Sequence, residues 1–383
     1  MEKPNSRIHV CARVRPIIPE DYKLGTVIRS SPEICVHLKS DGQTIKMTKD
    51  VYDIKMFRVD HTFDGVSSQM DVYNSSFKRI VVDALGGFNG TGMCYGQTGS
   101  GKSHTIFGSD REPGLVQCAI NDVFEDVRAR IEKGLVANVF LSFYQLYCEQ
   151  AYDLLIAPVN GKIDSVALAV REDIVKGAFV ENLQYIYVDD EDSTMDVLRQ
   201  GLKNRKVNST QFNMSSSRSH AIFQMYLDFE EPEDNSNGLV TNGTKHSSLD
   251  YRSEHSEETK KFSVRRRILT FVDLAGSERV QAHHASKSKA QFKESVTINK
   301  SISALGNCIQ ALANNSADQE QGYAESYNYQ SKRNLHIPFR DCKLTRLLAE
   351  PLGGNSKTCI IVNIGPCTYN YEETKSTLKF AKR

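Results

Sequence analysis

Several features that define other protein classes are missing from this chain of 383 residues. No apolar run approaches the length of a transmembrane helix, and the first ten residues lack the apolar region of a secretory signal. The nine cysteines include no C-x-x-C pair, the usual pattern of a zinc or redox site. The net charge of +1 creates no global field that would attract a polyanion. We therefore expect a reduced, cytosolic, globular protein.

Internal repeats and long Pro-rich or Gly/Ser linkers are also absent, so we expect one domain over 1–383. That length exceeds the usual limit for one core. Three polar stretches, near 39–54, 230–261 and 314–334, are interpreted as surface insertions. Their low apolar content predicts that they are mobile.

Segments typical of strands and of helices alternate along the chain. The strand candidates are rich in β-branched and aromatic residues and span 8–14, 91–95, 137–145, 221–229, 268–273 and 358–364. The helix candidates span 79–85, 115–131, 192–204, 295–314 and 342–349. The clearest is 295–314, in which Ile298, Ile302, Leu305 and Ile309 recur at helical spacing. This alternation predicts an α/β fold, with a central, mostly parallel sheet flanked by helices on both faces.

The sequence GQTGSGKS at 96–103 matches the phosphate-binding pattern G-x-x-x-x-G-K-[ST]. Its glycines let backbone N–H groups surround an anion, Lys102 adds a positive charge, and the Ser103 hydroxyl suits Mg²⁺. A predicted strand precedes the loop and a helix can follow it, which is the geometry of a phosphate site. We therefore expect a nucleoside triphosphate. The loop residues expected to bind it are Gly96, Gln97, Thr98, Gly99, Ser100, Gly101, Lys102 and Ser103.

A carboxylate ends the predicted strand 268–273, and LAGSE follows it. Asp273, held near Ser103, would orient Mg²⁺, and the Gly276 N–H would bind a γ-phosphate only when that phosphate is present. Taken alone, a strand-terminal aspartate more often caps a turn. The polar segment NMSSSRSH at 213–220 supplies further hydroxyls and an arginine that could pair with Glu278 across the cleft. Three segments converging on one phosphate favour a nucleotide site over chance matches.

The segments GQTGSGKS, NMSSSRSH and DLAGSER resemble, in that order, the P-loop, switch I and switch II of the kinesin motor domain. The resemblance covers nearly the whole chain and includes ARVRP at 12–16, SFYQLYCEQAYDLL at 142–155, INKSISALGNCI at 298–309 and HIPFRDCKLTRLL at 336–348. It implies a P-loop NTPase fold. It also implies an ATPase that couples hydrolysis of ATP to ADP and phosphate to microtubule binding and movement.

By position, the resemblance implies ATP rather than GTP, and the guanine-reading pattern N-K-x-D is absent. Arg13 and Pro16, with help from Tyr95 and His104, would form the adenine pocket. Mg²⁺ and the phosphates would be held by Lys102, Ser103, Ser217 and Asp273. The residues implied for catalysis are Ser216, Ser217, Arg218, Gly276 and Glu278. Among these the two serines close on the γ-phosphate, the Arg218–Glu278 ion pair positions the attacking water, and Gly276 is the sensor.

The resemblance also gives a partner to the basic segments, whose interpretation from charge alone is an ordinary solvated face. In kinesins the loop and helix after switch II and the segment around HIPFRDCKLTRLL face the acidic microtubule. The residues expected to contact it, in a salt-sensitive manner, are Lys289, Lys332, Arg333, Arg340, Lys343 and Arg346.

Several departures from the family pattern limit the resemblance. The segment after Arg279 is longer than usual and has no glycine, and Gln145 and Cys148 replace a usual glutamate and asparagine. The substitution at Gln145 either alters a tubulin contact or has no effect. Two alternatives stay open: a nucleotide-gated microtubule-binding module, or a depolymerising kinesin without processive stepping. An unrelated P-loop GTPase or kinase is disfavoured by the absent N-K-x-D and by the tubulin-facing motifs.

Further expectations follow from the resemblance alone. We expect plus-end movement, and a dimer formed through a coiled coil outside these residues. We expect no nucleic-acid partner and no direct membrane contact. The expected location is the cytoplasm and its microtubule cytoskeleton, with a cilium, flagellum or spindle as candidate structures.

Overall fold

The computed structural model describes residues 8–24, 32–50, 52–109, 111–156, 166–174, 177–211, 216–232, 262–278, 289–321, 336–354 and 356–382. Among these residues, no helix has both the length and the apolar character needed to cross a bilayer.

A large twisted sheet runs through the middle of the fold, in the strand order β11-β7-β12-β13-β6-β14-β1-β5, and β8 pairs with β7 outside that path. Its strands are β1 (His9–Val14), β5 (His61–Phe63), β6 (Asn89–Tyr95), β7 (Ala137–Tyr147), β8 (Gln150–Asp153), β11 (Ile186–Val188), β12 (His220–Pro232), β13 (Phe262–Asp273) and β14 (Ser356–Ile364). The pairs from β13 to β5 are parallel, and those from β11 to β13 are antiparallel. The α/β class is therefore confirmed, and the sheet is mixed rather than mostly parallel.

Alternate residues of each strand enter two separate cores, as the two-residue period of a strand requires. On β6, Cys94 joins one core, whereas Met93 and Tyr95 join the other. On β12, Phe223 faces the first core and Ile222 the second. Because both faces are covered, the central strands read as nearly continuous apolar runs.

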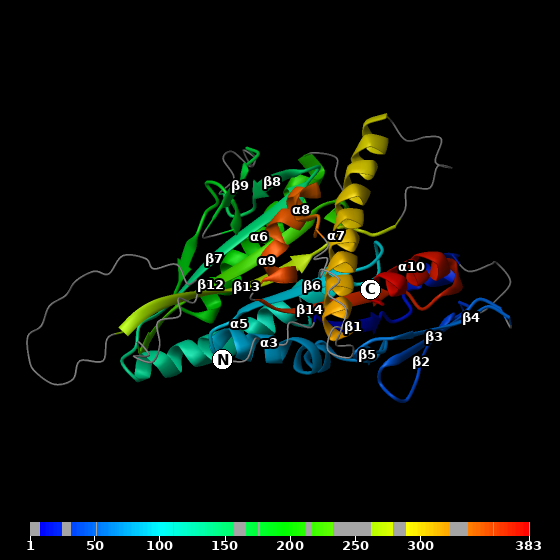
Figure 1. Cartoon of the computed structure of the whole chain (residues 1–383), viewed down its shortest axis with the longest axis horizontal. Helices are drawn as coiled ribbons and strands as arrows, with labels where there is room; N and C mark the ends of the chain where they lie inside the picture. Colours follow the sequence, from blue (N-terminus) through cyan, green and yellow to red (C-terminus); the bar gives the residue numbers. More distant parts are fainter. Residues whose placement is uncertain are drawn as a thin grey trace, which may run out of the picture.

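Helices cover both faces of the sheet (Figure 1). The first core is closed by α3 (Lys78–Leu85), α4 (Lys102–Phe107), α5 (Leu115–Glu132) and α6 (Glu191–Gln211), preceded by the short α2 (Gln69–Val72) and the π-helical η1 (Tyr73–Phe77). The second core is closed by α7 (Lys289–Gln321), α8 (Lys343–Leu347), α9 (Ala349–Gly353) and α10 (Tyr371–Ala381). The helix predicted at 342–349 is thus two short helices, and the one predicted at 295–314 is longer.

The helix α7 has a buried side and an exposed side. Ile298, Ile302, Leu305 and Ile309 are buried against the second core, as their spacing predicts. One end of α7 projects beyond the rest of the described fold (Figure 1). A helix attached along one stripe can move as a rigid rod if its few polar contacts change.

The segment 39–54, expected to be a surface insertion, contains regular secondary structure. It contains β3 (Thr44–Thr48), which pairs with β2 (Val36–Leu38) and β4 (Ile54–Arg58) in a separate antiparallel sheet. Ile45 and Met47 are fully buried because their alternation places both on the inner face of this sheet. The sequence did not reveal this strand because a five-residue strand carries only two inward side chains, too few to stand out from its polar neighbours.

The other two expected insertions lie largely outside the described residues. Residues 230–232 extend β12, and 314–321 extend α7. The remainder of both stretches, 233–261 and 322–334, falls outside the described part of the chain. A second small sheet, formed by β9 (Val170–Asp173) and β10 (Gly177–Val180), stands near α8.

Candidate nucleotide-binding site

The phosphate-binding pattern forms the predicted strand, loop and helix. β6 ends at Tyr95 and α4 begins at Lys102, with Gly101 at the N-cap in a left-handed conformation of φ 97°. A Cβ atom on Gly96 would lie 2.1 Å from the carbonyl oxygen of Asn363, so only glycine fits there. The loop is therefore pressed against β14, and its shape is fixed by backbone contacts.

Lys102 is buried inside this loop. Its ammonium donates to the carbonyl oxygens of Gly96 and Gln97, both at 2.8 Å. Burial lowers the pKa of Lys102, while the nearby carboxylates of Asp273 and Glu278 act in the opposite direction. The side chain thus holds a positive charge at the centre of the loop, where a polyphosphate would need it.

A buried carboxylate joins the loop to two other elements. Asp273, at the end of β13, accepts a hydrogen bond from the Ser103 hydroxyl at 2.6 Å and another from Arg205 of α6 at 2.7 Å. Arg205 also donates to the carbonyl oxygen of Ser219 at 3.2 Å. The side chains of Arg205 and Asp273 are only 6% and 1% exposed, so this ion pair is shielded from solvent.

The segments 216–220 and 274–278 meet at the same place. The Gly276 N–H donates to the carbonyl oxygen of Ser217 at 2.8 Å, and the Ser277 N–H donates to that of Gly96 at 3.1 Å. Ser216 and Ser217 belong to the short 3₁₀ helix η2 (Ser216–Arg218), and the side chain of Ser216 lies outside the described part. The three segments that the sequence singles out are therefore brought together.

The expected Arg218–Glu278 ion pair is not the one that this structure contains. Arg218 pairs with Glu294 of α7 at 3.0 Å. Glu278 instead accepts hydrogen bonds from the Thr98 N–H at 2.8 Å and the Thr98 hydroxyl at 2.5 Å. The physical reason is that each charged group already has a close partner, and the Thr98 N–H is an anion-binding group of the loop.

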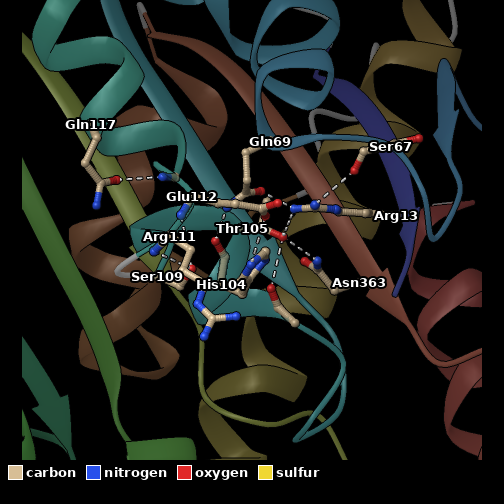
Figure 2. A network of polar contacts seen from close by, with 12 residues as sticks. Arg13, Ser67, Gln69, His104, Thr105, Ser109, Arg111, Glu112, Gln117 and Asn363 are labelled. Atoms are coloured by element: carbon tan, nitrogen blue, oxygen red, sulfur yellow. Dashed lines mark hydrogen bonds and ion pairs between the residues drawn. The ribbon is translucent and has the colours of Figure 1, made fainter. Parts of the chain in front are cut away.

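The residues expected around a base fall into two groups. Arg13 is buried where β1 meets α2 and α4, and it donates to Gln69 and to the Thr105 hydroxyl (Figure 2). His104, on the same helix as Thr105, is half-exposed, and burial followed by the nearby Arg13 lowers its pKa. Pro16 is exposed. His104 and Pro16 are therefore accessible to a ligand, whereas Arg13 is held inside the fold by its hydrogen bonds.

Tyr95 does not belong to that accessible group. Its ring stacks on Phe380 of α10 with centroids 3.8 Å apart, and the residue is 6% exposed. The assignment to the base pocket is therefore corrected: Tyr95 is the last residue of β6, and the strand alternation turns its side chain into the second core. The side chain of Gln97 likewise points away from the phosphate loop and donates to Asn370 at 2.7 Å. Only the backbone of Gln97 is therefore available to a phosphate.

The expected microtubule contacts are only partly described. Arg340 and Arg346 both approach Glu172 of β9, at 3.1 and 3.6 Å. Lys343 is the first residue of α8, and its N–H donates to Glu149 at 2.8 Å. Lys289 begins α7, with its side chain outside the described part, and Lys332 and Arg333 lie wholly outside it.

The substitution at Gln145 is settled by its burial. Gln145 is 1% exposed and its Oε1 accepts from the Ser219 hydroxyl at 3.2 Å, so it makes no tubulin contact in this conformation. Cys148 is half-buried, and burial is the main cause of its raised pKa. Neither residue lies at the phosphate loop.

A cavity of about 820 Å³ lies elsewhere, between the central sheet and α8, α9 and the β9-β10 sheet. Its lining includes Tyr144, Tyr226, Arg266 and Phe339, and none of the residues that hold the phosphate loop. Size alone would make it the default binding site, but its charged lining residues, among them Glu172, Arg266 and Arg340, do not surround a phosphate-binding loop.

Arg205 and His220 are site residues that sequence reasoning did not single out for a role. Arg205 follows a helix predicted to end at residue 204, and nothing in its neighbours marks it as inward-facing. His220 is the last residue of the polar segment, and its burial at 4% exposure shows only in the structure. The roles of Arg205 and His220 depend on the direction of their side chains, which a single sequence does not reveal.

Comparisons with known proteins agree with this geometry. The family model "Kinesin motor domain" matches residues 13–383. "Kinesin-like protein KIF18A" of Mus musculus is 37% identical over 331 residues, covering 86% of this chain and 32% of that protein. "Kinesin heavy chain" of Drosophila melanogaster is 35% identical over 387 residues, covering 98% of this chain and 32% of that protein. The chain therefore spans about a third of these relatives.

A solved structure described as "KIF14[391-772] dimer two-heads-bound state - AMP-PNP in complex with a microtubule" superposes with a TM-score of 0.77 and 30% identity. The alignment covers 99% of this chain and 93% of that one. The family prediction and the P-loop NTPase fold class are both confirmed. This chain belongs to the kinesin motor domain family.

Proposed function

We propose that this domain is a Mg²⁺-dependent ATP hydrolase whose turnover is stimulated by microtubules and coupled to movement along them. The observation that carries the proposal is the convergence of Lys102, Ser103 and Asp273 with the segments 216–220 and 274–278 around one phosphate loop. Family membership supports the same function. The expected location is the microtubule cytoskeleton.

Phosphate binding rests on the loop backbone and Lys102. The ammonium now donates to two loop carbonyls, and it would exchange these bonds for phosphate oxygens when ATP enters. The exchange keeps a buried ammonium hydrogen-bonded throughout, which avoids the cost of an unpaired charge. Because the loop geometry is fixed by β14, binding requires little rearrangement of the backbone.

The residues around Asp273 suit Mg²⁺. The site offers a hydroxyl from Ser103 and a carboxylate whose buried Oδ1 has no hydrogen-bond partner among the described residues. Mg²⁺ prefers such hard oxygen ligands and keeps several waters. When bound, the ion would neutralise charge on the β- and γ-phosphates. Ser103, Ser217 and Asp273 would hold it, and Arg205 fixes the orientation of the Asp273 carboxylate.

Hydrolysis requires that Arg218 and Glu278 change partners. Glu278 must leave Thr98, and Arg218 must leave Glu294, before the two can pair beside the γ-phosphate. Ser216, Ser217 and the Gly276 N–H then close around the phosphate and position the attacking water. Catalysis is achieved by positioning and charge stabilisation, with no covalent intermediate.

ATP is proposed over GTP because two residues of the expected adenine pocket, His104 and Pro16, present an exposed imidazole and an exposed proline ring. Such a surface binds a purine ring by stacking. The N-K-x-D pattern that would read guanine is missing from the sequence. The proposed preference is tested by competition between the two nucleotides.

The basic residues of α8 and its neighbours form the proposed microtubule face. Arg340 is 78% exposed, and its partner Glu172 is 44% exposed, so the pair is weak and can be exchanged for an acidic surface. Reversing the charge of Arg340, Lys343 or Arg346 should lower microtubule-stimulated turnover. Unchanged stimulation in all three variants would exclude this face.

The decisive experiment measures steady-state ATP hydrolysis with and without stabilised microtubules, in the wild type and in Lys102→Ala. We expect strong stimulation of the wild type and loss of activity in the variant, because no other described cation lies inside the loop. Lys78→Ala, an exposed lysine on α3, is the matched control and should behave as the wild type. Low turnover that microtubules do not change would favour the nucleotide-gated binding module.

A further inference from the structure

Residues 218–220 hold one face of α7 at two points. Arg218 pairs with Glu294 at 3.0 Å, and the His220 ring lies 2.9 Å from the Ser301 hydroxyl. Glu294 and Ser301 are seven residues apart, which places them on the same side of the helix two turns from each other. The segment that follows the switch serines is therefore bonded directly to the long helix.

The direction of each hydrogen bond at His220 follows from its neighbours. The Ala275 N–H donates to Nδ1 at 3.0 Å, so Nδ1 carries no proton. The ring proton is then on Nε2, which donates to the Ser301 hydroxyl, and that hydroxyl donates to the carbonyl oxygen of Ile298 at 2.7 Å. One consistent chain of bonds runs from the backbone at 275 to the backbone of α7.

Burial keeps this ring neutral. The pKa of His220 is lowered to about 3, chiefly by burial; Arg205 and Lys102 lower it further, whereas Asp273 raises it. A second proton on Nδ1 would abolish the acceptor for Ala275. The arrangement is therefore independent of pH in the physiological range.

Two consecutive backbone N–H groups of the proposed γ-phosphate sensor, at Ala275 and Gly276, donate hydrogen bonds to residues within 217–220. The Gly276 N–H binds the Ser217 carbonyl at 2.8 Å, and the Ala275 N–H binds His220. If the Gly276 N–H turns toward a γ-phosphate, it must leave Ser217. The adjoining peptide then shifts relative to His220, and Ser301 is the next group along the chain of bonds.

We propose that His220 is a positioning residue that transmits the state of residues 275–276 to α7 as a neutral relay, through Ala275 on one side and Ser301 on the other. The relay deepens the proposed function and rests on it. Its consequence is that the grip of α7 on its track depends on a buried imidazole that never touches the nucleotide.

Two substitutions separate the two bonds. In His220→Asn, the amide oxygen falls near the position of Nδ1, so it retains an acceptor for Ala275 and loses Ser301. In His220→Gln, the longer amide reaches the position of Nε2, so it retains a donor to Ser301 and loses Ala275. Ser301→Ala removes the helix partner alone. Thr297→Ala is the matched control, because its hydroxyl donates to the Lys293 carbonyl at 3.0 Å on the same helix, away from His220.

The first measurement is the ratio of microtubule-stimulated to basal ATP turnover. We expect it to fall about fivefold in His220→Asn and in Ser301→Ala, as the loss of one buried hydrogen bond of about 1 kcal/mol implies. The double variant should fall no further than either single one, since both remove the same bond. Thr297→Ala should keep the wild-type ratio. A wild-type ratio in both His220→Asn and Ser301→Ala would overturn the relay.

The second measurement needs no microtubules and so separates the relay from the proposed function. Amide exchange at Ala275 should be faster in His220→Gln and unchanged in His220→Asn. Nitrogen NMR of the wild-type imidazole should show an Nε2–H ring from pH 6 to 8. Titration within that range, or unchanged Ala275 exchange in His220→Gln, would refute the relay. If microtubules fail to stimulate the wild type, the proposed function fails and these spectra still decide the relay.

Discussion

The nucleotide site and the basic face at α8 carry similar charges in opposite settings. At the site, Arg205 and Asp273 are 6% and 1% exposed and meet at 2.7 Å. At the basic face, Arg340 and Glu172 are 78% and 44% exposed and meet at 3.1 Å. Similar pairings therefore differ mainly in how much water surrounds them.

That difference predicts two kinds of behaviour. A buried pair cannot lose one partner without leaving an uncompensated charge, so its geometry is fixed by the fold. An exposed pair is screened by salt and exchanged easily for an external partner. The molecule thus keeps a rigid arrangement where phosphate would bind and an adjustable one where an acidic partner would dock.

The largest expected effect comes from breaking the buried pair. Arg205→Ala should lower the free energy of unfolding by about 3–5 kcal/mol, because Asp273 would be left buried and unpaired. Urea denaturation monitored by circular dichroism measures the loss. Arg340→Ala is the exposed counterpart and should change stability by less than about 0.5 kcal/mol. Equal effects of the two substitutions would contradict the comparison.

A backbone substitution tests the rigidity of the site without altering charge. Gly96→Ala places a Cβ 2.1 Å from the Asn363 carbonyl oxygen, so the loop must move away from β14. We expect nucleotide affinity to fall about 100-fold, since a displacement of about 1 Å has effects of that size. Titration with a fluorescent ATP analogue measures it.

The control for this substitution is Gly134→Ala. Gly134 also has a positive φ, of 75°, but nothing lies within 4 Å of its added Cβ. It should lose about 1–2 kcal/mol of stability from backbone strain and keep its nucleotide affinity. A similar loss of affinity in both variants would show that strain alone, and not the contact with β14, weakens binding.

A second buried pair, Arg15 and Asp21, gives the comparison a pH dependence. Burial would raise the pKa of Asp21, but hydrogen bonds from Arg15, Tyr369 and the Ile18 N–H lower it to about 2. A carboxyl whose folded pKa is below its unfolded value stabilises the fold above about pH 4 and loses that contribution as the pH falls toward 2.

Asp21→Asn should therefore be about 2 kcal/mol less stable than the wild type at pH 7, with the gap closing between pH 4 and 2. Denaturation curves recorded across that range give the result. Asp196→Asn removes an exposed pair with Arg199, 77% and 65% exposed, and should show almost no gap. A pH-independent gap for Asp21→Asn would mean that the carboxylate charge is not its source.

The smallest expected effect belongs to the exposed face. Glu172→Gln releases Arg340 and Arg346, and microtubule affinity should rise about twofold to threefold at low salt and little at high salt. Cosedimentation at two ionic strengths measures it. Glu181→Gln, which releases Arg171 on the same small sheet, is the control. A rise that persists at high salt would show that the face is less exposed to solvent than its side chains suggest.

The sequence predicted what depends on local pattern. The phosphate loop, the strand that ends at Asp273 and the stripe on α7 all follow from residue spacing, and each lies where the pattern places it. Two of the segments converge because β6 and β13 are parallel and end at one edge of the sheet. The segment 216–220 joins them because β12 is antiparallel to β13 and begins where β13 ends.

The features that the sequence did not predict depend on the direction of side chains and on which charged groups pair. Tyr95 reads as a neighbour of the loop, yet strand alternation turns it into the core. Arg205 and His220 gain their roles by pointing inward from elements distant in sequence. Arg218 and Glu278 have the expected types at the expected positions, but the pairing of charges depends on which partner is nearest, and here each has another.

The stack of Tyr95 on Phe380 fixes the phosphate loop relative to α10. The ring of Tyr95, the residue before the phosphate loop, stacks face to face on Phe380 of α10. Gln97, within the loop, donates a hydrogen bond to Asn370 at the start of that helix. The loop and α10 therefore form one rigid unit, which serves as the stationary part, or stator, of the domain. Under the proposed function, α7 would move relative to this stator, and a force generated at the γ-phosphate would act between α7 and α10, two helices on the same face of the sheet.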